Sequence, residues 1–287
     1  MAPRESAYGR RVATAPTASR LADARRRLDA SFTGRFVREL LELRAFDRAL
    51  ALASKSFIAV LPLSILSTAV VSGRSFGDQI ARRFGLDGAG ADAARALFAA
   101  PTQIEASIGL LGVVILISSV MSFSRALERV YLDCWRLPPL GSATGRRLLW
   151  LTGFTLALTL LSFVRSTWVD ANTPVLQWIL GALAAGVFFL WTPYLLLGRR
   201  LTARRLLPTA VLTGSALLIL AVGSTLALPQ YVNHDTERYG LVGFTFAMVS
   251  WLFAASLLVV GSAALGAMLD RRARGEEDVP PPPEEED

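Results

Sequence analysis

The chain has 287 residues, of which 53% are hydrophobic, and its formal net charge is +7. This apolar fraction exceeds what the core of a soluble protein of this size needs, so it predicts a membrane protein. Cys134 is the only cysteine and His234 the only histidine, which excludes an internal disulfide and a zinc site built from several cysteine and histidine ligands.

Two segments precede the apolar part of the chain. Residues 1–20 are rich in Ala, Arg, Thr and Pro and lack an apolar period, which predicts disorder. Residues 21–48 are predicted to form a cytoplasmic amphipathic helix, because apolar side chains recur there at helical spacing: Phe32, Phe36, Leu40 and Leu43. This helix either rests on the inner membrane surface or packs on the rest of the protein, and the pattern leaves both interpretations open.

Six apolar segments follow, each close to the roughly 20 residues that cross about 30 Å of hydrocarbon. A backbone in lipid must satisfy its own hydrogen bonds, so each segment is predicted to be a helix. Short connections favour one antiparallel bundle. The predicted fold is therefore all-α, with a transmembrane domain over residues 49–269 and spans at about 50–72, 105–124, 148–166, 175–197, 206–228 and 241–268.

The arginines set the orientation of these spans. If both termini are inside, 23 of the 29 arginines lie in inner segments and 6 in outer segments. The positive-inside rule therefore predicts a multi-pass protein with both termini in the cytoplasm. Trp135, Trp150 and Trp191 fall near the predicted inner boundary, where indole rings are common. Since topology accounts for the basic excess and no nucleic-acid-binding motif accompanies it, no nucleic-acid partner is expected.

Glycines and prolines mark the segments outside the spans. The outer segment 73–104 is broken by glycines, and its flanks 76–84 and 91–99 are predicted to form two short helices. The outer segment 229–240 is predicted to be a loop that exposes His234 to solvent. The tail 270–287 ends in four prolines and four acidic residues and is predicted to be disordered and cytoplasmic.

One lysine and one proline in the first span are candidate functional residues. Lys55 lies about one turn into that span, and an ionisable residue there is costly to bury. Its ammonium group either reaches the inner headgroups or lies in a polar cavity, and both interpretations stay open. Pro62 removes one helical hydrogen bond and is predicted to kink the span.

The second span ends in a charged cluster formed by Arg125, Glu128 and Arg129. Arg125 and Arg129 share one helical face with Ser118 and Ser122, and Glu128 is placed to pair with Arg125 at i+3. The cluster indicates either an anion or lipid-headgroup site near the inner mouth of the bundle, or a salt bridge that caps the helix and anchors its topology.

Small and hydroxyl-bearing residues in the last two spans predict close helix packing rather than a substrate site. They are Thr209, Thr213 and Ser224 in the fifth span, and Ser262 and Gly266 in the sixth. No P-loop, nucleophile elbow or paired-histidine metalloprotease motif is present. We therefore expect neither an enzyme nor a cofactor.

Three stretches together resemble one family. They are Arg48 to Pro62, then Ile108 to Gly112 running on to Phe123, Ala126, Leu127, Tyr131 and Trp135, then Tyr239, Gly240, Gly243, Trp251, Leu252 and Gly261. Their order and spacing are similar to the YihY/BrkB family of bacterial inner-membrane proteins, once called ribonuclease BN-like. The likeness covers roughly residues 30–270. It implies a six-span protein of the bacterial inner membrane whose biochemical activity is not established.

The chain departs from this family at polar positions. It has Ser54 and Lys55 where relatives usually carry paired aromatics, and Ser262-Ala263 where they often carry Ala-Glu. We therefore treat it as a divergent member and carry over no catalytic residue. The leading hypothesis is transport or lipid handling, with membrane lipids as partners and a small molecule or lipid as substrate; a homo-oligomer stays open. The alternative is a non-transporting scaffold, and ribonuclease activity is not expected.

Overall fold

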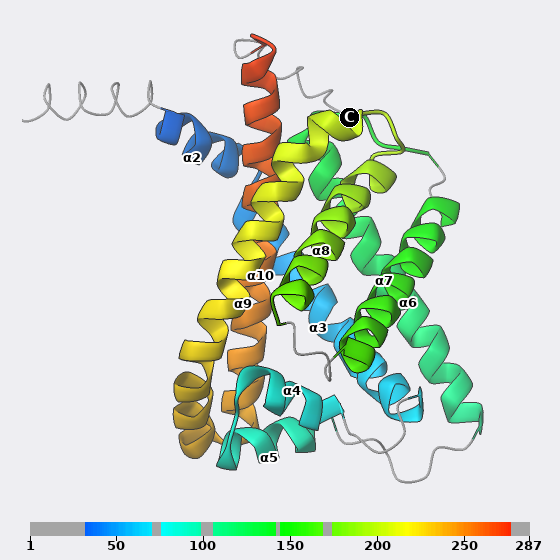
Figure 1. Ribbon diagram of the computed structural model, residues 1–287. Helices are drawn as coiled ribbons and strands as arrows, with labels where there is room; N and C mark the ends of the chain where they lie inside the picture. Colours follow the sequence, from blue (N-terminus) through cyan, green and yellow to red (C-terminus); the bar gives the residue numbers. More distant parts are fainter. Residues whose placement is uncertain (1–31, 71–75, 99–105, 142–143, 169–173, 277–287) are drawn as a thin grey trace, which may run out of the picture.

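The computed structural model describes residues 32–70, 76–98, 106–141, 144–168 and 174–276, and all regular structure in these ranges is helical (Figure 1). The predicted all-α fold is confirmed, and a helix lies at each of the six apolar segments. The disorder predicted for residues 1–20 and for the end of the tail falls outside the described residues. The helices are α2 Phe32–Glu42, α3 Ala45–Val70, α4 Phe76–Phe84, α5 Gly88–Leu97, α6 Ala106–Cys134, α7 Thr144–Trp168, α8 Pro174–Leu196, α9 Ala203–Tyr239 and α10 Leu241–Ala273.

The six long helices α3 and α6 to α10 form an antiparallel bundle (Figure 1). Its main core receives buried side chains from each of them: Leu52, Leu127, Trp150, Leu196, Leu206 and Val260. Close van der Waals packing among these side chains holds the half of the bundle next to α2 together.

Helices α9 and α10 approach each other closely along a seam of small side chains. A Cβ atom on Gly266 would lie 2.7 Å from the Cα atom of Thr209, so only glycine fits at this crossing. Thr209, Thr213 and Ser224 are all buried. The Ser224 hydroxyl accepts a 2.7 Å hydrogen bond from the indole nitrogen of Trp251 on α10. The packing role predicted for these residues is confirmed.

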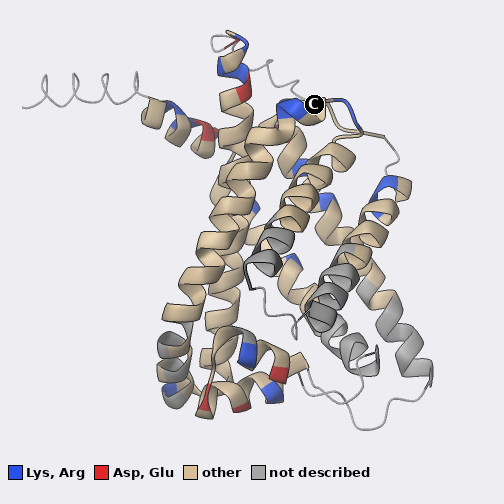
Figure 2. Cartoon of the chain, viewed as in Figure 1, with Lys and Arg blue, Asp and Glu red and all other residues tan. Residues whose placement is uncertain are grey.

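Long uncharged stretches run through α9 and α10. Neither residues 206–234 nor residues 241–269 contain Asp, Glu, Lys or Arg, and Figure 2 shows the charges of the described residues beyond them, toward the ends of these helices. Among the described residues, two helices are long and apolar enough to cross a membrane, Ala203–Ala227 and Leu241–Ala273, and Leu183–Leu196 is a shorter apolar stretch. Only 22% and 44% of the two apolar windows are buried inside the protein, so much of their surface faces outward.

Helices α4 and α5 form a hairpin against α9 and α10 at the end of the bundle opposite α2 (Figure 1). The prediction of two short helices in this segment is confirmed, with α5 beginning three residues earlier than expected. The hairpin has its own core, in which Ala94 and Phe98 meet Val232 of α9 and Phe244 and Ala247 of α10.

This hairpin also explains why the predicted end of α9 was wrong. Residues 229–240 were predicted to be a loop, but α9 continues through Pro229 to Tyr239. Its last turns are stabilised by tertiary contact, because Val232 and Thr236 are buried there. His234 is exposed, as predicted, but on a helix.

Two further boundaries differ from the prediction. The helix predicted over residues 21–48 is interrupted at Leu43 and Arg44, where Arg44 adopts a φ of 48°, and residues 21–31 lie outside the described part. At the other end, α10 extends to Ala273 although disorder was predicted from Asp270. Asp270 is buried and accepts hydrogen bonds from Arg205, and this contact holds the last turns of α10 on the bundle.

Candidate functional site

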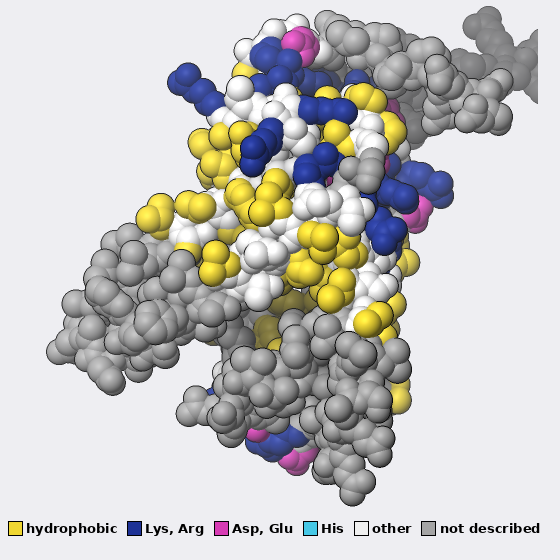
Figure 3. Space-filling view, turned by 90° about the vertical axis from the view of Figure 1, so that its right-hand side faces the viewer, with side chains coloured by type: hydrophobic (Ala, Val, Ile, Leu, Met, Phe, Trp, Pro, Cys, Tyr) yellow, Lys and Arg dark blue, Asp and Glu magenta, His cyan; other side chains and the backbone are white. Residues whose placement is uncertain are grey.

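One end of the bundle is strongly basic. The end of α6, the start of α7, the turn between α8 and α9 and the end of α10 all lie at the same end of the bundle as α2 (Figure 1). The described residues of this end (32–48, 125–150, 198–205 and 270–276) include sixteen arginines but only seven acidic residues. Figure 3 shows Lys and Arg gathered over this part of one face, with hydrophobic side chains beneath them. We call it the arginine-rich end.

Glu128 lies at the centre of the candidate site. Its side chain is 3% exposed, and its carboxylate accepts hydrogen bonds from Arg146 at 3.2 Å and from Arg147 at 2.8 Å. Both arginines belong to the first turn of α7, so one α6 carboxylate joins two helices. One negative charge cannot neutralise two guanidinium groups, and the trio retains one positive charge.

Arg125 and Arg129 lie on one face of α6, as their spacing predicted, and both are exposed. The expected pair between Arg125 and Glu128 is not formed, because the carboxylate turns inward to α7. Arg125 donates instead to the Met121 carbonyl oxygen at 3.4 Å. Neither arginine forms an ion pair with any described residue. The candidate site therefore adds two uncompensated charges to that of the trio.

The turn between α8 and α9 lies beside this cluster. A Cβ atom on Gly198, whose φ is 67°, would come within 3.4 Å of a terminal nitrogen of Arg146. Arg200 donates a 3.0 Å hydrogen bond to the Pro138 carbonyl oxygen and so ties the turn to the segment after α6. Arg199 is exposed, with a φ of 59° that is uncommon outside glycine. Its charge follows the C-terminus of α8, where a cation is favoured by the helix dipole.

A second set of ion pairs fastens α2 and α10 to the same end. Glu39 of α2 accepts hydrogen bonds from Arg271 at 2.6 Å and from Arg136 at 3.2 Å. Phe36 and Leu40 lie against the main core. The described part of the amphipathic segment thus packs on the protein, which is one of the two interpretations that its pattern left open.

Lys55 is half-buried in α3 and forms no hydrogen bond or ion pair with a described residue. The ion pair between Arg48 and Asp133 joins the start of α3 to the end of α6, and the two helices run antiparallel (Figure 1), so Lys55 lies near the level of Ala126. This register brings Lys55 to the depth of Arg125. Pro62 lies within the continuous helix α3, its side chain is not among those described, and the kink stays a prediction.

Sequence reasoning missed Arg146 and Arg147 as partners of Glu128. The available signal was two consecutive arginines at the start of a helix that follows the one carrying Glu128. Within the described ranges, no group of three or more His, Cys, Asp or Glu side chains is placed to hold a metal ion.

Comparison with known proteins identifies the family. The family model described as Virulence factor BrkB matches residues 36–287. The chain belongs to the BrkB family. No curated protein and no solved structure matches it. Because BrkB is a family of membrane proteins and α9 and α10 are apolar enough to span a bilayer, this BrkB-family chain is a membrane protein. The match begins at Phe36 and thus includes the arginine-rich end described above except for residues 32–35.

Proposed function

We propose that this protein is a six-span protein of the bacterial inner membrane, with both termini in the cytoplasm, that binds an anionic lipid headgroup or a similar anion at its arginine-rich end during transport or lipid handling. The proposal rests on one observation above all: Arg125 and Arg129 are exposed without an ion pair to a described residue, beside a trio that is itself positive.

The chemistry of arginine suits this ligand. A guanidinium group donates two parallel hydrogen bonds to phosphate or carboxylate oxygens, which a lysine ammonium group does not. Glu128 holds Arg146 and Arg147 at the start of α7, so these two side chains are oriented before a ligand arrives. Pre-orientation lowers the entropy lost on binding. Within the described part of the chain, only the arginine-rich end carries such an excess of positive charge, and by the positive-inside rule this favours a cytoplasmic location for that end.

The test compares two double variants with the same change in net charge. Arg125→Gln with Arg129→Gln removes the exposed charges of the site, whereas Arg82→Gln with Arg238→Gln removes two exposed arginines from α4 and the end of α9. Each protein is placed in nanodiscs that contain phosphatidylglycerol and phosphatidylcholine and is released into a native mass spectrometer. We expect stoichiometric phosphatidylglycerol on the wild type and on the Arg82/Arg238 variant, and its loss from the Arg125/Arg129 variant.

A translocation assay in vesicles that contain headgroup-labelled phosphatidylglycerol distinguishes lipid handling from a scaffold role without transport. Translocation by the wild type, slowed by Lys55→Ala without loss of folded protein, would support transport through the bundle. Binding without translocation would favour the scaffold alternative. No bound anionic lipid, or equal binding to both double variants, would refute the headgroup site and leave these arginines as topology anchors.

A further inference from the structure

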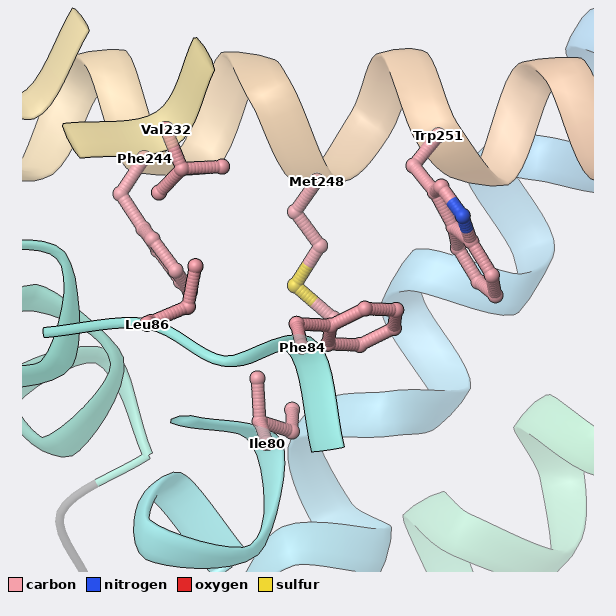
Figure 4. Close-up of a pocket in the computed structure, with 7 residues that line it drawn as sticks. All are labelled: Ile80, Phe84, Leu86, Val232, Phe244, Met248 and Trp251. Atoms are coloured by element: carbon pink, nitrogen blue, oxygen red, sulfur yellow. The ribbon is translucent and has the colours of Figure 1, made fainter. Parts of the chain in front are cut away.

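The α4–α5 hairpin encloses a pocket with α9 and α10, at the end of the bundle opposite the arginine-rich end. Ile80 and Phe84 of α4 and Leu86 of the following turn form one wall (Figure 4). The other wall is formed by Val232 of α9 and by three residues of α10, Phe244, Met248 and Trp251. The cavity measures about 50 Å³, well below the roughly 300–1,000 Å³ typical of small-molecule sites, so it admits only a slender group.

Every side chain that lines the pocket is apolar except for one indole nitrogen, and that nitrogen already has a partner. It donates to the Ser224 hydroxyl at 2.7 Å, and the Trp251 ring packs edge-on against Phe84 with 5.3 Å between centroids. A ligand therefore finds no free hydrogen-bonding group among the lining side chains. Burying an unpaired polar group costs several kcal/mol, so the part of a ligand that enters must be hydrocarbon.

The surfaces around the pocket indicate which kind of hydrocarbon is available to enter it. The hairpin exposes charged side chains, among them Asp87, Asp92 and Arg95. Figure 2 shows acidic and basic positions along the hairpin at that end of the molecule. The helices α9 and α10 expose large apolar residues close to the pocket walls: Leu226 at 74%, Val242 at 75% and Phe246 at 63%. The pocket thus lies where a charged cap meets an apolar helix surface, as at the boundary between water and a bilayer.

From this placement we infer a second ligand site, in which the pocket takes one alkyl chain of a membrane lipid. A helix of a partner protein, about 10 Å across, does not fit a space of this size, whereas the end of a single alkyl chain does. The inference rests on the membrane location proposed above but not on the arginine site, which binds the opposite chemical part of a lipid at the opposite end of the bundle.

A photoreactive lipid tests this inference. Full-length protein is reconstituted with a phospholipid that carries a diazirine near the end of one acyl chain, irradiated, and mapped by peptide mass spectrometry. Bulk lipid reaches exposed residues such as Phe246 but not Leu86, Val232 or Phe244, which are at most 5% exposed. We expect adducts on these three buried residues in the wild type.

Two tryptophan substitutions on α10 form the matched comparison. Met248→Trp fills the pocket and should abolish the adducts on buried lining residues, while Phe246→Trp, on an exposed neighbour, should preserve them. Ile80→Phe narrows the same pocket from α4 and takes the place of Met248→Trp if that variant does not elute as folded protein. Adducts confined to exposed residues, pocket adducts unchanged by filling, or crosslinks to another polypeptide at these residues would overturn the inference. Loss of headgroup binding in the Arg125/Arg129 variant with pocket adducts retained would leave both sites standing.

Discussion

Replacing Glu128 by glutamine should destabilise the bundle more than any other single loss of an acidic charge at the arginine-rich end. The substitution keeps the shape of the side chain but removes the charge that Arg146 and Arg147 share. The two guanidinium groups, only 26% and 18% exposed, then face each other without a counter-ion. The contact between the end of α6 and the start of α7 should weaken.

The magnitude follows from burial. A hydrogen bond to a charged group contributes about 1.5–3 kcal/mol, and removing one partner of a buried ion pair costs about 3–5 kcal/mol. Glutamine retains one acceptor oxygen, and water reaches both arginines in part, so the expected loss is about 2–4 kcal/mol. For a domain of this size that corresponds to a fall of roughly 5–10 °C in the unfolding midpoint.

Cys134 provides the assay, because it is the only cysteine and is buried. A maleimide dye that fluoresces on reaction with thiols then reports the temperature at which the bundle opens. Glu42→Gln, an identical substitution at an exposed position of α2, is the control and should change the midpoint little. Adding Arg147→Gln to Glu128→Gln should restore part of the loss. A Glu128→Gln midpoint equal to that of the control would refute the reasoning.

Three further outcomes follow from the packing. Burial raises the pKa of Cys134 from 9.0 to about 12, so between these pH values the thiol is deprotonated in unfolded chains but stays protonated in folded chains. The free energy of unfolding should therefore fall as the pH rises through this range. Denaturant titrations at several pH values measure this fall. Gly266→Ala should lower the unfolding midpoint, because the added Cβ atom would clash with α9. Gly261→Ala, on the same helix but facing open space, should leave the midpoint unchanged or raise it. Equal shifts for the two variants would contradict the close α9–α10 crossing. Glu39→Gln should speed amide hydrogen exchange in α2 by loosening its tie to Arg271, and unchanged exchange would show that apolar contacts alone hold this helix.

Much of the helical architecture could be predicted because apolar length and glycine breaks are local properties. The six long helices and the α4–α5 hairpin follow from them. The predicted ends of two helices were wrong because tertiary contacts determine where these helices end. Helix α9 continues past Pro229 because Val232 gains buried contacts with the hairpin. No pattern within residues 229–240 predicts these contacts. Helix α10 continues past Asp270 because Arg205, 65 residues away, pairs with it.

The candidate site was likewise only partly predictable from the sequence. Helical spacing correctly grouped Arg125 and Arg129 on one face, but it offered only a neighbour on the same helix as the partner of Glu128. The actual partners start the next helix, and only the fold brings them together. Trp150 fell near the predicted membrane boundary, yet its ring is buried in the core and donates to Thr192 at 3.3 Å. Apolarity alone cannot distinguish an indole at the bilayer surface from one between helices.

Cysteine accessibility tests the six-span topology most directly. In a Cys134→Ala background, single cysteines replace exposed residues in four segments: Pro139 and Thr202 at the arginine-rich end, Asp92 and Tyr239 at the opposite end. A membrane-impermeant maleimide is applied to right-side-out membrane vesicles before and after lysis. The proposed topology predicts labelling of Asp92→Cys and Tyr239→Cys in intact vesicles, and of Pro139→Cys and Thr202→Cys only after lysis. Labelling of all four in intact vesicles, or the reverse pattern, would contradict it.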